Sequence, residues 1–345
     1  MLSDEVKLFV RPWNRPPFGG LPSGAELSQL ANGDEDSIFK WSPATSWLWN
    51  LHHQLARVGK KTALVERIPD RGVVLICGQD MPLWFRPPKK LLLVSIAADS
   101  PLRMFADVHV VQNPMQAERF TSSFRDPACV FIPHFPQFGL IPRDPLRGDR
   151  FERVAFLGAR PQLEEKLRSR EFAQAVEEIG LTFEIRRERF QHHDYSAIDA
   201  VLAVRSFDES NLYVHKPATK LVNAWHAGVP AILGRESAYR EAGDPGQNYL
   251  EVSSINDVLT ALRCLKNDVV LRRRLVGNGR RQYRAYSEEA VTQVWTRFLD
   301  NDLPVISERI RGGGFAYRSM YRQDQILRRI GASLQQRLLP HNSRK

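Results

Sequence analysis

At 345 residues, with 43% apolar and 10% aromatic side chains, the chain is large enough for two hydrophobic cores and lacks the composition of a disordered protein. Its three cysteines are odd in number and far apart, which argues against a disulfide framework or a zinc site and favours a cytoplasmic location. No apolar run approaches the roughly 20 residues of a membrane-spanning helix, and the formal net charge of +10 predicts an anionic partner, such as a nucleotide diphosphate, a lipid surface or a nucleic acid.

Short apolar runs with helical or loop connections between them fill the first part of the chain. A helix is expected over 45–58, where Trp47, Leu48, Leu51 and Leu55 share one side. Strands are expected at 6–10, 62–65, 73–77, 91–96, 108–111 and 130–133. Strands that alternate with crossovers predict a parallel sheet.

A proline-rich and basic stretch, 133–150, is expected to link this part to a second α/β unit. That unit is expected to contain a helix over 163–179 and strands at 154–158, 182–185, 200–204, 229–233 and 249–252, followed by helices over 255–265 and 269–286. The pattern predicts an α/β fold of two Rossmann-like domains, residues 1–140 and 141–300, with a basic helical tail at 301–345. Ligands in such sheets bind outside the carboxyl ends of the strands, so the expected site is the cleft between the domains.

Residues 215–233 carry the strongest local signals. Pro217 suits the first turn of a helix, Gly228 suits its end, and 229–233 is typical of a short buried strand. This arrangement would bring His215 and Lys216 to the N-terminus of a helix, with Lys220 one turn further in. Because a helix N-terminus offers free N–H groups and positive dipole charge, it suits a phosphate. The alternative is a basic helix of any α/β protein.

The segment KLVNAWHAGVPAI, residues 220–232, resembles the K-L-x-E-A-x-A-x-G-x-P-V-I segment of glycosyltransferases with the GT-B fold. The similarity covers roughly residues 150–300. It implies a C-terminal domain that holds a nucleotide-sugar donor and an N-terminal domain that binds the acceptor. The retaining branch of the family has two glutamates separated by seven residues; His215 and Asn223 stand at those positions here. Asn223 can both donate and accept hydrogen bonds and is expected to hold the ribose, whereas the anomeric outcome stays open.

The resemblance also implies which residues meet the donor. Lys220 coincides with the diphosphate-binding lysine of the family, and Glu236 lies in the loop that contacts the donor sugar. Arg205 follows the expected strand 200–204 and would assist at the diphosphate, or would pair instead with Asp208 or Glu209. Fixed cations can stabilise a leaving diphosphate without a metal.

An inverting enzyme would need a general base on the N-terminal domain. Asp99 is the first candidate because it follows the apolar run 91–98, although a turn or helix-cap role is the alternative. His134 follows the strand that ends near 132 and is the second candidate. Further candidates, for which a structural role is the alternative, are Glu26, His52, His53 and Asp80.

Two short patterns near the N-terminus are typical of glycosyltransferase sites. The resemblance implies that Gly19 and Gly20 form a loop beside the donor, and an ordinary tight turn is the alternative. Asp34, Glu35 and Asp36 spell a DxD metal motif, but they sit in a polar segment with no strand before it. We therefore expect neither a metal nor a cofactor, and the nucleotide-sugar acts as co-substrate.

The tail has a pattern of its own. Apolar side chains share one helical face over 315–339, and arginines occupy much of the remainder. Such a helix would lie on an anionic membrane or pack back on the N-terminal domain. The first alternative would place the protein at the inner face of the cytoplasmic membrane.

With these patterns, the resemblance to GT-B glycosyltransferases implies a cytoplasmic, metal-independent enzyme that moves a sugar from a nucleotide donor to a hydroxyl group. The habit of the family and the basic charge suggest a glycan or lipid-linked acceptor, in cell-surface glycan or glycolipid synthesis. One alternative is a nucleotide-sugar epimerase with the same fold. Another is a non-catalytic basic module that binds nucleic acid or a partner protein. Nucleic acid is the less favoured partner because no RNP or zinc-finger signature is present.

Overall fold

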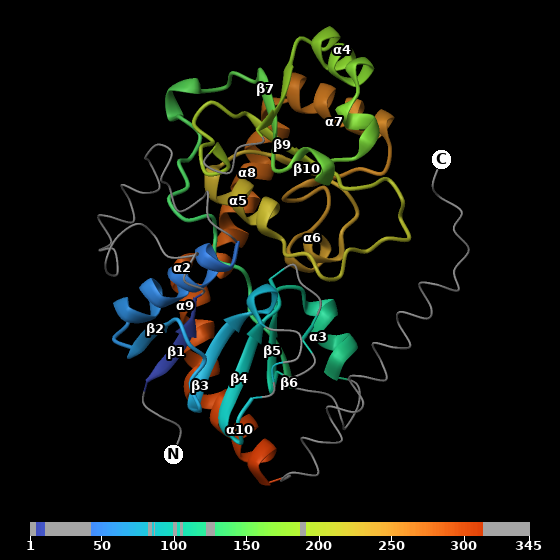
Figure 1. Cartoon of the computed structure of the whole chain (residues 1–345). Coiled ribbons are helices and arrows are strands. Elements are labelled where there is room, and N and C mark those ends of the chain that lie inside the picture. Colours follow the sequence, from blue (N-terminus) through green and yellow to red (C-terminus); the bar gives the residue numbers. More distant parts are fainter. Residues whose placement is uncertain are drawn as a thin grey trace, which may run out of the picture.

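The computed structural model describes residues 5–10, 43–81, 85, 87–98, 102–103, 106–121, 128–186 and 191–312. These residues form two α/β domains, one above the other in Figure 1, each built on a parallel sheet. The predicted class is therefore confirmed. We call the unit around the first sheet the first domain and the unit around the second sheet the second domain.

The first sheet has six described strands in the order β2-β1-β3-β4-β5-β6, all parallel. Alternate side chains of β3 enter different cores: Val73 and Leu75 point into one, Val74 and Ile76 into the other. Burial on both faces explains why this strand has a continuous apolar sequence. The strands are β1 (Val6–Phe9), β2 (Thr62–Val65), β3 (Arg71–Cys77), β4 (Lys90–Ile96), β5 (Val108–Val111) and β6 (Ala128–Phe131).

Helices from both ends of the chain cover one face of this sheet. Helix α2 (Pro43–Arg57) buries Leu48, Leu51 and Leu55 there, as its periodicity predicts. Helices α9 (Glu288–Arg297) and α10 (Leu303–Gly312), joined by a π-helical turn (Phe298–Asp302), pack beside it and run along the sheet in Figure 1. Trp295 lies in this core, so the last part of the expected domain 141–300 packs on the first domain. The tail helix expected at 315–339 lies outside the described residues.

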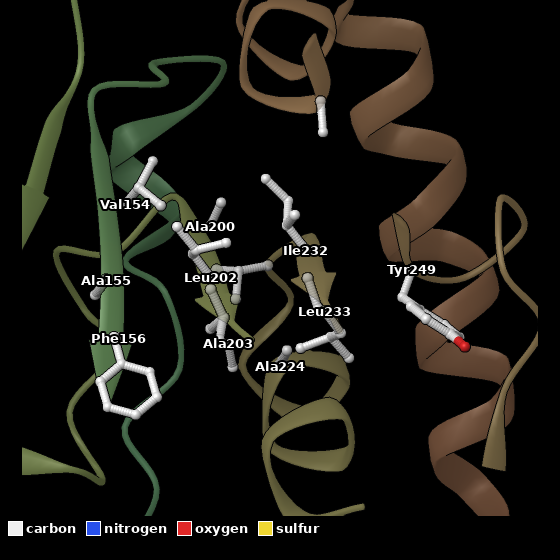
Figure 2. Packing of buried hydrophobic residues seen from close by; sticks show 14 of the residues in the cluster. Val154, Ala155, Phe156, Ala200, Leu202, Ala203, Ala224, Ile232, Leu233 and Tyr249 are labelled. Atoms are coloured by element: carbon white, nitrogen blue, oxygen red, sulfur yellow. The ribbon is translucent and has the colours of Figure 1, made fainter. Parts of the chain in front are cut away.

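The second sheet has the order β11-β10-β9-β7-β8 and is also parallel. Its strands are β7 (Arg153–Leu157), β8 (Thr182–Arg186), β9 (Ala200–Ala203), β10 (Ala231–Leu233) and β11 (Leu250–Glu251). Its helices are α4 (Arg170–Glu178), α5 (Thr219–Ala227), α6 (Ser237–Ala242), α7 (Ile255–Asn267) and α8 (Val269–Tyr283). Figure 2 shows the core, where Ala224 of α5 lies near Ala203 and Leu233; the small alanines allow the helix to pack close to the sheet.

One predicted helix is wrong in extent. The periodicity over 163–179 predicts a single helix, but the structure has 3₁₀ turns at Arg160–Gln162 and Glu165–Arg168 before α4. The reason is local: the hydroxyl of Ser169 accepts a hydrogen bond from the N–H of Phe172 at 3.1 Å, which caps a new helix there.

Each sheet has a point where the strand order reverses. In the first sheet it lies between β1 and β3, and in the second between β7 and β9. Chain connections leave such a point toward opposite faces, which opens a crevice at the carboxyl ends of the two strands. The carboxyl edges of the two sheets meet, because Asn113 after β5 bonds to Ser237 after β10. The predicted cleft between the domains therefore contains the described reversal points.

Candidate functional site

Lys220 and Gly158 meet at the reversal point of the second sheet. Gly158 directly follows β7, and Lys220 lies in the first turn of α5. The Lys220 Nζ atom is 5.2 Å from the centre of the Phe156 ring and 3.4 Å from the place that a Cβ atom at Gly158 would occupy. A side chain at position 158 would also lie 2.9 Å from that ring. Glycine therefore leaves the space in which the lysine head group lies over the end of β7.

Arg205 lies on the other side of the same point, two residues after β9. Its Nε atom is 3.6 Å from Oε2 of Glu236, and both side chains are buried, at 12% and 2% exposed. The two alternative partners have contacts of their own: Asp208 accepts from the hydroxyl of Ser210 at 2.7 Å, and Glu209 pairs with Arg235. Glu236, expected in a loop that contacts the donor sugar, is buried and directly precedes α6 as its N-cap residue.

Tyr213 belongs to the same cluster. The Arg205 guanidinium carbon lies 5.9 Å from the centre of its ring. Burial raises the pKa of the Tyr213 hydroxyl, a hydrogen bond from Ser206 acts in the opposite direction, and the neighbouring Glu236 raises the pKa further. Tyr213 has φ of +48°, a conformation that is uncommon for residues other than glycine. Backbone strain of this kind occurs often in ligand-binding loops.

The loop before α5 carries the other two expected cations. His215 is exposed and Lys216 is half-buried, and the N–H of Lys216 donates to the carbonyl of Tyr213 at 2.8 Å. Helix α5 begins later than Pro217 predicts: its first helical bond joins the N–H of Val222 to the carbonyl of Ala218 at 3.0 Å. Its end at Gly228, with φ of +73°, is as predicted. The N–H groups of the first turn have no acceptor within the helix and are suited to an anion.

Asn223 is directed toward the interdomain linker. Its side-chain oxygen accepts from the N–H of Gln137 at 2.9 Å, and its side chain also bonds to the hydroxyl of Tyr195. The residue is buried. In this arrangement Asn223 ties α5 to the linker, so a role at the ribose would require these bonds to open.

His134 lies between the domains, just after β6. Its ring is packed edge-on against Trp47, with ring centres 3.6 Å apart. Its Nδ1 atom bonds to the carbonyl of Phe135. Since a carbonyl only accepts, Nδ1 is the donor in this contact. When the ring is neutral, Nε2 is then the nitrogen that can accept a proton.

His134 also lines a small, partly open hollow between the domains. Pro114 and Phe131 contribute from the first domain, and Thr219 and Ala242 contribute from the second. The hollow therefore brings the candidate base and the first turn of α5 to one space, although they are about 85 positions apart in sequence.

The structure assigns other positions to two of the remaining candidates. Nδ1 of His52 bonds to the hydroxyl of Thr62 at 2.7 Å, at the start of β2 and therefore at the edge away from the cleft. The ring of His53 faces Phe138 of the linker. Asp80 is buried just after β3, at the carboxyl edge. Outside the described residues lie Asp99, Gly19, Gly20, Glu26 and the acidic triplet 34–36.

Sequence reasoning missed Gly158, Tyr213 and Asn113. Asn113 is followed by Pro114, a pair typical of a helix start, and this signal would have identified it as the cap of α3 (Pro114–Thr121). Nothing in the sequence indicates the positive φ of Tyr213. Contacts that join residues far apart in the chain left no local signal.

The described residues contain no group of three or more histidine, cysteine, aspartate or glutamate side chains arranged to hold a metal ion. No helix in the described ranges has the length and apolar character that a membrane crossing needs.

Neither a protein-family model nor a curated protein sequence matches the chain. Among solved structures, it is similar to sucrose-phosphate synthase from Thermosynechococcus elongatus, with a TM-score of 0.53 and 13% identity over 87% of this chain and 99% of that one. It is also similar to HepE from Anabaena in complex with UDP and glucose, with a TM-score of 0.50 and 12% identity over 86% of this chain and 99% of that one. The chain therefore has the two-domain GT-B fold.

Proposed function

We propose that this chain, which has the GT-B fold, is a glycosyltransferase that moves a sugar from a nucleotide-sugar donor to a hydroxyl acceptor. The observation that carries the proposal is the pair of cations at the reversal point of the second sheet. Lys220 lies over Gly158 after β7, and Arg205 follows the neighbouring β9. The likeness to HepE, whose structure contains UDP and glucose, supports a nucleotide-sugar as the donor.

The donor diphosphate would bind against Lys220 and the first turn of α5, with Lys216 and His215 at its edge. During transfer the acceptor oxygen forms a bond to the anomeric carbon, and the bond from that carbon to the diphosphate oxygen breaks. The electron pair stays on the diphosphate, so negative charge grows beside Lys220. Fixed cations stabilise such charge because they need no reorganisation. We accordingly propose that transfer requires no metal.

The acceptor hydroxyl must lose its proton during the same step. In an inverting enzyme, Nε2 of His134 is the described group best suited to receive it, since the ring lines the space shared with α5. Asp99 remains the alternative base. The anomeric configuration of the product, read by NMR, tests the proposal: retention would exclude a direct displacement assisted by either base.

We propose a glycan or lipid-linked acceptor, used in cell-surface glycan synthesis at the inner face of the membrane. The net charge of +10 and the basic amphipathic pattern at 315–339 support contact with anionic lipid. Flotation of the full chain with phosphatidylglycerol vesicles, compared with phosphatidylcholine vesicles, tests this part. Equal behaviour with both would contradict it.

The donor is best tested by a thermal-shift screen against UDP-, GDP-, dTDP- and CMP-sugars, with and without EDTA. A ligand that binds only the folded state raises Tm, by an amount that grows with its concentration. We expect one nucleotide to stabilise the protein equally in both conditions, and nucleotide release to require an acceptor. Interconversion of the donor sugar without transfer would favour an epimerase. Salt-sensitive RNA binding with no shift for any nucleotide would favour a nucleic-acid module.

A further inference from the structure

Asn113 joins the two domains through one buried side chain. It follows β5 in the first domain and is fully buried. Its Nδ2 atom donates to the carbonyl of Lys216 at 3.2 Å and to the hydroxyl of Ser237 at 2.8 Å, both in the second domain. Its Oδ1 atom accepts from the N–H of Met115 at 3.1 Å, within its own domain. All the polar atoms of the side chain are thus engaged.

The two segments that Asn113 holds are the ones that carry the expected donor residues. Lys216 bonds back to Tyr213, whose ring lies against Arg205. Arg205 pairs with Glu236, the residue before Ser237.

The N–H of Ser237 also donates to the carbonyl of Leu212 at 3.0 Å. These contacts form a closed ring of residues, which we call the circuit: each member contacts the next, and the ring begins and ends at Asn113. Asn113 is the member that belongs to the first domain.

We propose that Asn113 is a positioning residue: it fixes the loop 205–218 and the start of α6 against the first domain, and so places Arg205, Lys216 and Glu236 for the donor when the cleft is closed. This consequence for transfer rests on the proposed function, whereas the interdomain contact does not. A buried amide whose two N–H groups bond to two segments specifies one arrangement, because leaving either acceptor unpaired in a dry interior is costly. The competing role is that Asn113 only caps α3.

Two variants separate these roles. Asn113→Asp keeps the oxygen that caps α3 but replaces the two N–H donors with an oxygen that faces the Lys216 carbonyl. Ser237→Ala removes one partner from the second domain and leaves α3 untouched. Ser307→Ala is the matched control, since Ser307 is equally buried, at 2% against 3% for Ser237, and lies on α10.

The interdomain readout does not depend on activity. Spin labels at positions 58 and 270 would report the distance between the domains, because Val58 and Val270 are 53% and 76% exposed. The exposed Cys264 is replaced by serine in all samples, and Cys77 and Cys129 are buried. We expect a broader distance distribution in Asn113→Asp and Ser237→Ala, and an unchanged one in Ser307→Ala.

The second readout is donor kinetics. Losing one such bond is expected to raise the donor KM about fivefold to tenfold, with a smaller change in kcat. The double variant Asn113→Asp, Ser237→Ala should have a donor KM no higher than the poorer single variant, because both changes break the same set of contacts. If the wild type transfers no sugar, the proposed function fails and the distance measurement still decides the role of Asn113. Wild-type distances in both variants would overturn the proposal, and Ser237→Ala decides alone if Asn113→Asp does not fold.

Discussion

Replacing Glu236 with glutamine tests the charge balance of the candidate site directly. Arg205 and Glu236 are 3.6 Å apart and 12% and 2% exposed, so water screens them little. With an effective dielectric constant of about 20, two unit charges at that separation attract by about 4–5 kcal/mol. Removing one partner of a buried pair also leaves the other charge uncompensated, which typically lowers stability by about 3–5 kcal/mol.

We therefore expect Glu236→Gln to lower the free energy of unfolding by about 3–5 kcal/mol, measured by urea denaturation in low salt. An anion bound at the site would restore the missing charge. Pyrophosphate, used as a simple diphosphate probe, should then raise Tm more in the variant than in the wild type. The double variant Arg205→Met, Glu236→Gln should be more stable than Glu236→Gln alone and should lose this response.

Two results would refute this reasoning. If Glu236→Gln unfolds at the same urea concentration as the wild type, the pair contributes no net stability. If pyrophosphate stabilises the wild type and the variant equally, Arg205 does not face the anion site and is not one of the residues that bind the donor.

Three further predictions concern single residues. Lys220→Met should lower turnover about 10²-fold or more while weakening donor binding less, because charge on the leaving group grows in the transition state. Single-turnover kinetics and calorimetry would measure the two effects, and equal losses in turnover and donor affinity would make Lys220 a simple binding residue. Gly279→Ala should lower stability by about 1–3 kcal/mol because its Cβ would overlap the Trp225 ring, whereas Gly277→Ala on the same helix meets only a side-chain atom at 3.9 Å and should raise Tm slightly. Burial lowers the pKa of His109 from 6.5 to about 3, so the unfolded chain binds a proton that the folded chain does not, and stability falls as the pH drops below 6.5. Between pH 7.5 and 5, His109→Gln should lose about 2 kcal/mol less than the wild type in urea titrations, and parallel pH profiles would contradict the assignment.

Local signals in the sequence account for most of the fold. The strands of both sheets lie within a few residues of their predicted positions. For the central strands, such as β3 and β4, the reason is that burial on both faces requires a continuous apolar run. Gly228 ends α5 as predicted, because the helix end requires the positive φ, +73°, that glycine adopts without strain. The helix face of Leu48, Leu51 and Leu55 is also as predicted.

Partnerships between distant residues could not be read in the same way. The sequence offers Arg205 a place at the diphosphate or, as the alternative, a pairing with its neighbours Asp208 or Glu209; it gives no sign of Glu236, which the β10 connection brings to the same edge. Nor could periodicity tell which sheet α9 covers: its apolar face, which includes Trp295, fits the first domain although the chain reaches it from the second. Tertiary packing makes these choices after the local elements are set.

Asn223, which stands where the resembling motif has a glutamate, contacts the linker between the domains. Phe135 belongs to the core of the first domain, whereas the N–H of Gln137 is held by Asn223 of the second. From there the linker stays with the second domain, since Arg143 bonds to the buried Asp199 at 3.0 Å. The chain therefore passes from the first domain to the second close to residue 136.

The chain returns from the second domain to the first over a similarly short stretch. Tyr283 stacks on His226 of the second domain, with ring centres 4.6 Å apart, and Val291 already lies in the core of the first domain. Both crossings thus span few residues and lie beside the hollow that His134 lines. A glutamate at position 223 would accept from Gln137 but could not donate to the hydroxyl of Tyr195, whereas an asparagine side chain does both. An asparagine at this position therefore satisfies both contacts, and it ties the linker to α5.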